Sequence, residues 1–302
     1  DNTKHEWHTD ELDAQNVSNA HIDGETFAGE VITATVRLDN QCQIPRKDFI
    51  VTRRARRINK AGQRDELARQ VTRKGRELKR DMEGIVLRHQ AKVVDDGATA
   101  PLLGGLPTYI TGTTDRAAGG SDPTGNGVDI PTQGTVPRAL DEAGLLDVVR
   151  AIYDDSQELP NVLMLDPASK QNFSNYMFGS SARVATQYQD QGKSPRGGVR
   201  VIGAVDTWVT DFCILDVVPN RFIPDYSTAT TPGGAGEFDA FIYNTDMVDI
   251  CYFDSISTDA MAKTADTDDR MVLADFTVVP RNPKTVGIFA DIDSTTAMVA
   301  GT

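Results

Sequence analysis

Two histidines near the start of the chain, His5 and His8, flank the side chains of Glu6 and Trp7. Histidines three residues apart share one face of a helix and would supply two ligands to a zinc ion. The HExxH spacing of zinc hydrolases is absent, however, and the surrounding sequence offers no third ligand. A surface or packing role is therefore favoured, and no metal site is assigned.

Asp266, Asp268 and Asp269 form an acidic cluster that resembles part of a calcium-binding loop. The glycine and the closing glutamate of an EF-hand loop are missing, so a solvated turn is favoured. Two further acidic pairs stand at expected helix ends and need no catalytic explanation: Asp95 with Asp96, and Asp154 with Asp155.

Motifs for nucleotide binding or covalent catalysis are also missing. The sequence has no phosphate-binding loop, no dinucleotide fingerprint and no GxSxG nucleophile elbow. Its three cysteines, Cys42, Cys213 and Cys251, are far apart and form no CxxC pair, which favours reduced thiols. Cys213 and Cys251 stand in apolar stretches and are read as core residues. We therefore predict no catalytic centre and no cofactor, and we keep a soluble acidic enzyme as an alternative from another class.

Charge is distributed unevenly along the 302 residues, although the net charge is −13. Residues 46–92 hold 16 Lys or Arg and 6 Asp or Glu, about +10, whereas the remainder carries about −23. This segment has Phe49 as its only aromatic side chain, so it lacks the interleaved aromatics of single-strand binders. The asymmetry suits a basic element that meets acidic surfaces of neighbouring copies. A solvated helix face is the alternative.

The hydropathy of the chain and its first residues predict neither a membrane helix nor a signal peptide. No stretch approaches the roughly 18 apolar residues of a membrane helix. The polar start does not resemble a signal peptide, and the missing initiator Met suggests that the natural N-terminus precedes this chain.

Residues 25–58 contain two stretches with the character of β-strands. Side chains alternate over residues 31–38, and residues 49–52 form a second short strand. The intervening DNQCQIPRK would join them into a long hairpin, with Pro45 at a bend or on an unpaired edge. Residues 1–24 are expected to be irregular.

Residues 60–94 carry the clearest helical pattern. Apolar side chains, with one histidine among them, recur at steps of three, four or seven, at Leu67, Val71, Leu78, Met82, Ile85, His89 and Val93. After a loop over residues 97–137, helices are expected over residues 137–156 and in DPASKQNFSNYMF, with a buried strand in NVLMLDP between them. From residue 199 onward the stretches VRVIGAV, DTWVTDFCILDVVP, AFIYN, MVDICYF, RMVLADFTVVP and TVGIFADI predict strands. The order favours an α+β fold without regular βαβ alternation.

Several ordered strings carry a resemblance to one protein family. They are TKHEWHTDEL, QIPRKDFIVT, INKAGQRDELARQVTRKGRELKRDMEGIVLRHQAKV, TAPLLGGLPTYI, PNVLMLDPASKQNF, DTWVTDFCILDVVPNRF and AKTADTDDRMVLADFTVVPRNPKTVGIFADI. Together they resemble the SU-ten-type major capsid proteins of tailed bacteriophages, from residue 4 to about residue 292. The resemblance implies the capsid fold first described for phage Hong Kong 97.

The resemblance also implies a division of the chain. Residues 1–24 would form an N-terminal arm, residues 25–58 the extended loop, and residues 59–137 the peripheral domain with the spine helix at 60–94. Residues 138–253 would form the axial domain, and residues 254–302 would return to the peripheral domain. STATTPGGAGEFD (227–239) looks like a local insertion, and no residues are assigned to covalent cross-links.

The implied function is structural. Pentamers and hexamers of this chain would form an icosahedral head that encloses double-stranded DNA without sequence-specific contacts. Scaffold, cement and portal proteins would be further partners, with synthesis in the bacterial cytoplasm and a final location in the virion. A shell of the encapsulin type, which packages protein, is the alternative. Candidate contacts between subunits are Arg53, Arg54, Arg56 and Arg57, where the arm rejoins the helix, and Trp7.

Overall fold

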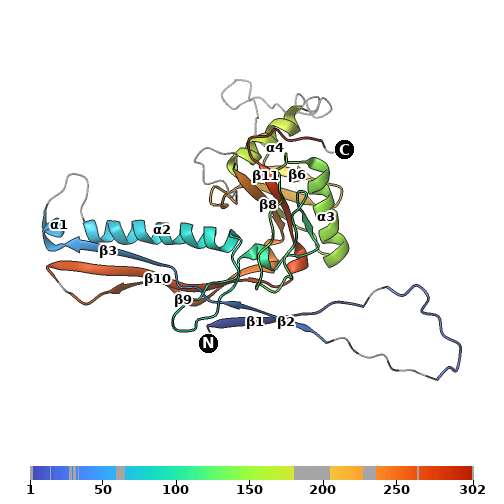
Figure 1. Ribbon diagram of the computed structural model, residues 1–302, viewed down its shortest axis with the longest axis horizontal. Helices are drawn as coiled ribbons and strands as arrows, with labels where there is room; N and C mark the ends of the chain where they lie inside the picture. The colour runs from blue at the N-terminus through green and yellow to red at the C-terminus, as the bar shows by residue number, and fades with distance from the viewer. Residues whose placement is uncertain are drawn as a thin grey trace, which may run out of the picture.

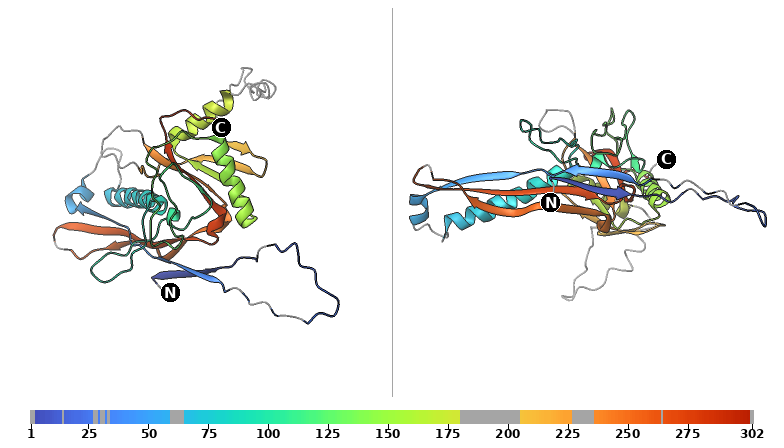
Figure 2. Two further views of the ribbon diagram at one scale, coloured as in Figure 1. Left: turned by 45° about the vertical axis from the view of Figure 1, so that its right-hand side comes forward. Right: turned by 90° about the horizontal axis from the view of Figure 1, so that it is seen from below.

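A computed structural model describes residues 3–13, 15–26, 29, 32, 34–58, 65–179, 205–226, 236–263 and 265–300. An arm made of a long helix over three strands extends to one side of a mixed helix-and-sheet body (Figure 1). A thin hairpin near the N-terminus extends to the other side, as the view from below also shows (Figure 2). Both projections leave much of their surface uncovered by the body.

The arm is built on helix α2, Glu66–Leu87, which begins where the Asp65 side chain accepts a hydrogen bond from the backbone of Leu67. Its apolar stripe, including Leu78 and Met82, is buried. It packs on the antiparallel sheet β3–β10–β9, formed by Arg46–Thr52, Thr267–Pro280 and Val248–Ala260. The predicted spine helix is confirmed over these residues.

The prediction that this helix continues to residue 94 is wrong. After Leu87 the chain forms hydrogen bonds with residues distant in sequence, and these end the helix. His89 binds Asp239, and the side chain of Gln90 donates to the carbonyl of Leu103 at 2.9 Å. Val93 then pairs with Leu102 in an isolated bridge. The part of the prediction over residues 60–64 lies outside the described residues.

The predicted hairpin over residues 25–58 is also wrong. Strand β2, Val36–Gln41, pairs with β1, Lys4–Thr9, so part of the segment expected to be irregular is a strand. Strand β3 pairs with β10 instead of β2. The buried Asn40 side chain explains the switch, since it donates to the carbonyls of Gly104 and Val278. These bonds anchor Asn40 in the stretch that was expected to join the two strands of a hairpin. Of the strand pattern predicted over residues 31–38, positions 32, 34 and 35 have no strand structure, and positions 31 and 33 lie outside the described residues.

The body contains a six-stranded mixed sheet in the order β4–β11–β8–β5–β7–β6. Helices α3, Glu142–Ser156, and α4, Pro167–Gly179, pack against it, and their existence was predicted correctly. The strands are β4 Thr114–Asp115, β5 Val162–Leu165, β6 Thr207–Val209, β7 Ile214–Pro219, β8 Glu237–Tyr243 and β11 Val286–Asp293. Helix α1, Arg53–Arg57, and three single 3-10 turns, Leu106–Thr108, Thr245–Met247 and Pro283–Thr285, complete the described elements.

Helix α3 begins later than predicted because residues 138 and 141 are extended. Arg138 forms a bridge with Ile292, and Asp141 with Val299. Asp141 then caps the helix by accepting from the backbone of Ala143 at 3.1 Å. The five later strand-forming stretches, from DTWVTDFCILDVVP onward, are confirmed, whereas VRVIGAV lies almost wholly outside the described residues, as does most of the insertion at 227–239.

Two apolar cores share strands β8 and β11. The first core lies under α2 and includes Phe241 and Ile288. The second lies under α3 and α4 and includes Ile242 and Phe289. Because successive side chains of a strand point to opposite faces, these two strands join the arm to the body. The mixed architecture confirms the α+β class.

Candidate assembly interface

The four arginines predicted as contacts, which we call the basic tip, all lie on the short helix α1 at the far end of the arm (Figure 1). Strand β3 leads directly into this helix, and the Thr52 hydroxyl caps it by accepting from the backbone of Ala55 at 3.3 Å. The structure therefore brings together Arg53, Arg54, Arg56 and Arg57, and all four side chains are exposed.

The acidic cluster that resembled a calcium loop lies beside the basic tip. Arg53 Nε is 3.0 Å from a carboxylate oxygen of Asp266, and Arg56 forms an ion pair with Asp268. These partners belong to the same chain, since β10 begins opposite the end of β3. The predicted contacts are with acidic side chains of another subunit. The structure of a single chain does not test them.

Trp7 lies apart from the basic tip, on β1 at the base of the hairpin. Its ring is half-buried against Tyr109, with ring centroids 5.7 Å apart. Its indole Nε1 is buried and has no hydrogen-bond partner among the described residues. The Tyr109 hydroxyl donates to the carbonyl of Asp39 at 2.8 Å, which fixes the ring below the hairpin. Within one subunit Trp7 therefore helps to set the direction of the hairpin.

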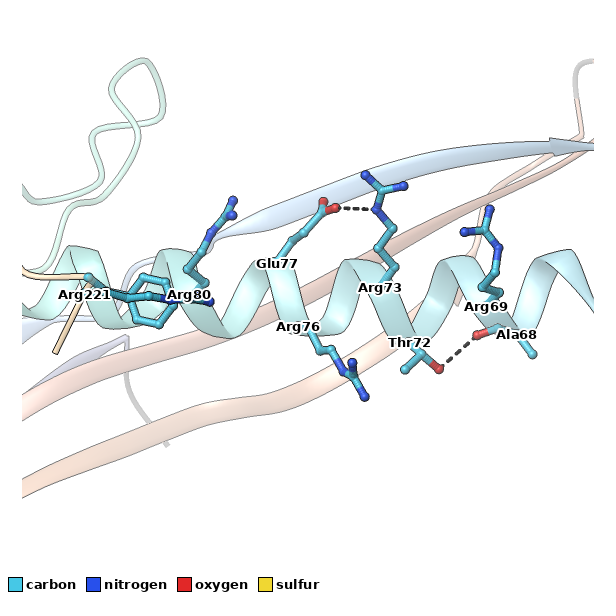
Figure 3. A pocket seen from close by; sticks show the side chains of 9 residues that line it. Ala68, Arg69, Thr72, Arg73, Arg76, Glu77, Arg80 and Arg221 are labelled. Carbon is cyan, nitrogen blue, oxygen red and sulfur yellow. Dashed lines mark hydrogen bonds and ion pairs between the residues drawn. The ribbon is translucent and has the colours of Figure 1, made fainter. Parts of the chain in front are cut away.

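An arginine face on α2 was not recognised from the sequence. Arg69, Arg73, Arg76 and Arg80 line an open groove with Arg221 from the loop after β7 (Figure 3). Their steps of four, three and four place them on one side of the helix, opposite the buried stripe. The same helical spacing that predicted the apolar stripe also relates these four arginines. It would have revealed the row if the charged residues had been compared in the same way.

Strand β9 presents a second surface that one subunit leaves open. It is an edge strand of its sheet and carries the exposed apolar side chains of Ile250, Tyr252 and Phe253. An unpaired edge with apolar side chains favours association with another chain. The neighbouring groove of about 560 Å³, between α2 and β9, is lined largely by apolar side chains.

A buried polar network joins the helix end to the body. His89 lies between Asp239, at 2.9 Å, and Gln133, at 3.1 Å, and stacks on the Tyr226 ring with centroids 3.8 Å apart. Burial, together with the nearby carboxylates of Asp291, Asp239 and Asp225, raises the pKa of the neighbouring Glu237 to about 7. These groups are enclosed by packed strands and loops, which suits a structural role.

The cysteines and acids give no sign of a reactive centre in the described part of the chain. All three cysteines are free thiols, and burial raises the pKa of Cys42 to about 11, so its thiolate is scarce at neutral pH. The other two, Cys213 and Cys251, are half-buried and lie less deep than predicted. No group of three or more described His, Cys, Asp or Glu side chains is placed to hold a metal ion. No described helix is both long and apolar enough to span a bilayer.

Comparisons with known proteins agree with this picture. The major capsid protein of Escherichia phage Phieco32 is 29% identical over 198 residues, which span 55% of this chain and 56% of that protein. The match therefore covers little more than half the length of that relative.

The fold matches solved shells far more distant in sequence. The capsid of cyanophage A-1(L) superposes with a TM-score of 0.60 at 13% identity, over 96% of this chain and 88% of that one. The capsid of cyanophage P-SCSP1u gives 0.54 at 10% identity, over 99% and 84%. The SrpI encapsulin of Synechococcus elongatus PCC 7942 gives 0.52 at 9% identity, over 88% and 80%. These likenesses establish the Hong Kong 97-type fold.

The family model for the SU10 major capsid protein matches residues 1–293, nearly the whole chain. The chain therefore belongs to the SU10 major capsid protein family, structural subunits of phage capsids with the Hong Kong 97-type fold.

Proposed function

We propose that this chain assembles as pentamers and hexamers into the icosahedral head of a tailed phage that encloses double-stranded DNA. The family match over residues 1–293 carries the proposal. The surfaces described above support it, because a two-stranded hairpin alone is marginal in water and needs a partner.

The domain boundaries take a revised form in this proposal. The extended loop corresponds to the β1–β2 hairpin and the residues between its strands, in place of residues 25–58. In this proposal the core under α2 forms the peripheral domain, for which residues 59–137 and 254–302 were predicted, and the core under α3 and α4 forms the axial domain, predicted at 138–253. The first core also includes Phe49 and Phe241, and the second includes Phe289, so neither core keeps to the predicted bounds. The predicted boundary after residue 253 falls inside strand β9, which runs without interruption from Val248 to Ala260.

The remaining partners follow from this role. The mature protein would reside in the virion after synthesis in the host cytoplasm, with scaffold, cement and portal proteins as accessory partners. The capsid would enclose DNA without reading its sequence, and the chain would carry no enzymatic activity. A turnover that one point mutation abolishes while assembly stays intact would contradict the last statement.

A protein-packaging compartment is the alternative, favoured by the similarity of the fold to the SrpI encapsulin. Both functions predict closed shells, so the nucleic acid content of native particles separates them. Particles purified from infected cells and treated with nuclease should contain protected double-stranded DNA. Protein cargo without DNA would support the encapsulin alternative.

Electron microscopy of the purified chain tests the proposal itself. We expect closed shells with pentameric and hexameric clusters. A chain that stays a small monomer under every assembly condition, with or without accessory proteins, would refute the proposed function.

A further inference from the structure

We propose that the arginine face of α2 (Arg69, Arg73, Arg76, Arg80 and Arg221) binds the phosphate backbone of the enclosed nucleic acid. This inference rests on the proposed function, because it requires a shell that contains DNA. It adds a specific contact surface to a subunit whose net charge is −13.

The row lies on the side of α2 that faces away from the sheet, with Arg69, Arg73 and Arg80 directed to one edge of that side and Arg76 to the other (Figure 3). The apolar side of α2 faces the β3–β10 sheet, and the arginines occupy the opposite side of the helix. Residues 69 and 80 are eleven positions apart, which corresponds to about 16 Å along the helix axis. That length equals the rise of about five base pairs along the axis of duplex DNA.

Internal contacts position the row and leave donors for a ligand. Arg73 donates its Nε to Glu77 at 3.0 Å, which leaves its terminal nitrogens directed outward (Figure 3). Arg69 is held by Glu66 at 2.5 Å, and Arg76 has no carboxylate partner among the described residues. The guanidinium of Arg221 lies 4.7 Å from the centre of the Phe222 ring, beside the end of the row. Guanidinium groups bind phosphate oxygens through paired hydrogen bonds, whereas lysines act as point charges.

An acidic surface of a neighbouring copy fits the row less well. A complementary partner needs carboxylates at similar steps, and no described helix presents them. On α3, Asp147 and Asp154 are seven residues apart, and Arg150 stands between them and pairs with Asp147 at 3.1 Å. A polyphosphate backbone supplies a continuous row of negative charge of any length.

Binding of a short duplex DNA to the full unassembled chain tests the inference. One variant replaces three arginines of the row, as Arg73→Gln, Arg76→Gln and Arg80→Gln. The matched control removes the same charge from exposed arginines elsewhere, as Arg37→Gln, Arg150→Gln and Arg281→Gln. At low salt we expect at least about tenfold weaker binding for the row variant, with a slope of log K against log salt lower by about 2–3, and a smaller effect in the control.

Equal effects of the two variants would overturn the inference, because they would show only a response to net charge. It would also be overturned if the row variant lost binding to a polyglutamate peptide while its DNA binding stayed unchanged. Electron microscopy of DNA-filled shells gives an independent readout: acidic side chains of another subunit against the row would refute the DNA contact. Wild-type chains that form no shells would refute the proposed function instead, so the two failures are distinguishable.

Discussion

His89 Nε2 lies 2.9 Å from a carboxylate oxygen of Asp239, and the two side chains are only 9% and 0% exposed. One residue follows the long helix of the arm, and the other belongs to strand β8 of the body. Because Asp239 also accepts from the backbone of Asp291 at 3.2 Å, the pair connects the helix end to two central strands. This contact fixes the helix against the sheet that both cores share.

Replacing His89 with alanine should destabilise the subunit by about 2–3 kcal/mol, because it leaves a buried carboxylate without its principal partner. Urea unfolding of the unassembled chain measures this change. The control, His21→Ala, removes a histidine whose side chain is 75% exposed and should change stability by less than about 0.5 kcal/mol. Equal stability of the two variants would show that the buried pair contributes nothing net.

Glu237 makes the stability of the subunit depend on pH. Its pKa rises from an ordinary 4.5 to about 7 through burial and neighbouring carboxylates, so the folded state holds a proton that the unfolded state releases. Stability from this group is therefore present below pH 4.5 and lost as pH rises to about 7. The Glu237→Gln variant should not lose this stability. Its free energy of unfolding at pH 8 should therefore be about 1 kcal/mol higher than that of the wild type.

The advantage of the Glu237→Gln variant should vanish at acidic pH, where the wild-type carboxyl is already neutral. Unfolding curves measured across this pH range test the sign. The exposed Glu158→Gln substitution serves as the control and should show a pH dependence parallel to wild type. A Glu237→Gln variant that is less stable than wild type at every pH would contradict the mechanism.

Replacing two glycines with alanine, one at a time, should change the stability of the subunit in opposite directions. A β-carbon on Gly287 would lie 2.4 Å from a methyl carbon of Val148, because α3 packs closely on β11 there. We expect a loss of about 1–3 kcal/mol from this overpacking. Gly75 lies within α2 with nothing within 4 Å of the added carbon, so Gly75→Ala should gain about 0.5–1 kcal/mol. Thermal unfolding of the two variants beside wild type measures both signs.

The periodicity of α2 could be predicted because it is a local property of the chain. Where the helix ends could not, since His89 continues the apolar spacing and yet binds Asp239, which is 150 residues away. The strands of the N-terminal region raise the same difficulty. Alternation predicts a strand and its faces without specifying its partner, so β2 was assigned to the wrong neighbour.

The four arginines of the basic tip were expected just before the long helix, and they do lie between β3 and α2, but their partners within the chain were not foreseen. Arg53 and Asp266 are more than 200 residues apart in sequence; Arg53 was expected to contact another subunit, and Asp266 was expected to lie in a solvated turn. Only the antiparallel register of β3 and β10 brings them together. The family resemblance predicted the fold class and the assembly role, which no single motif would have provided.

The last prediction concerns the basic tip and the growth of the shell. Its arginines project from the end of a thin arm, far from the body, and two of them already have acidic partners in the same chain. Arg54 and Arg57 are exposed and remain available to carboxylates of an adjacent subunit. Each exposed pair contributes only about 0.2–1 kcal/mol. An icosahedral shell repeats each contact many times, so such small contributions affect assembly more than folding.

Changing all four arginines of the basic tip to glutamine should therefore leave a folded subunit that assembles poorly. Light scattering and electron microscopy measure assembly, and circular dichroism checks the fold. Added salt should weaken wild-type assembly intermediates, because screening reduces exposed ion pairs. As a control, Arg150→Gln with Arg281→Gln removes exposed charge from the body and the base of the arm. Normal assembly of the fourfold variant, or a shell structure in which no acid of another subunit approaches the tip, would show that these arginines serve only the contacts within their own chain.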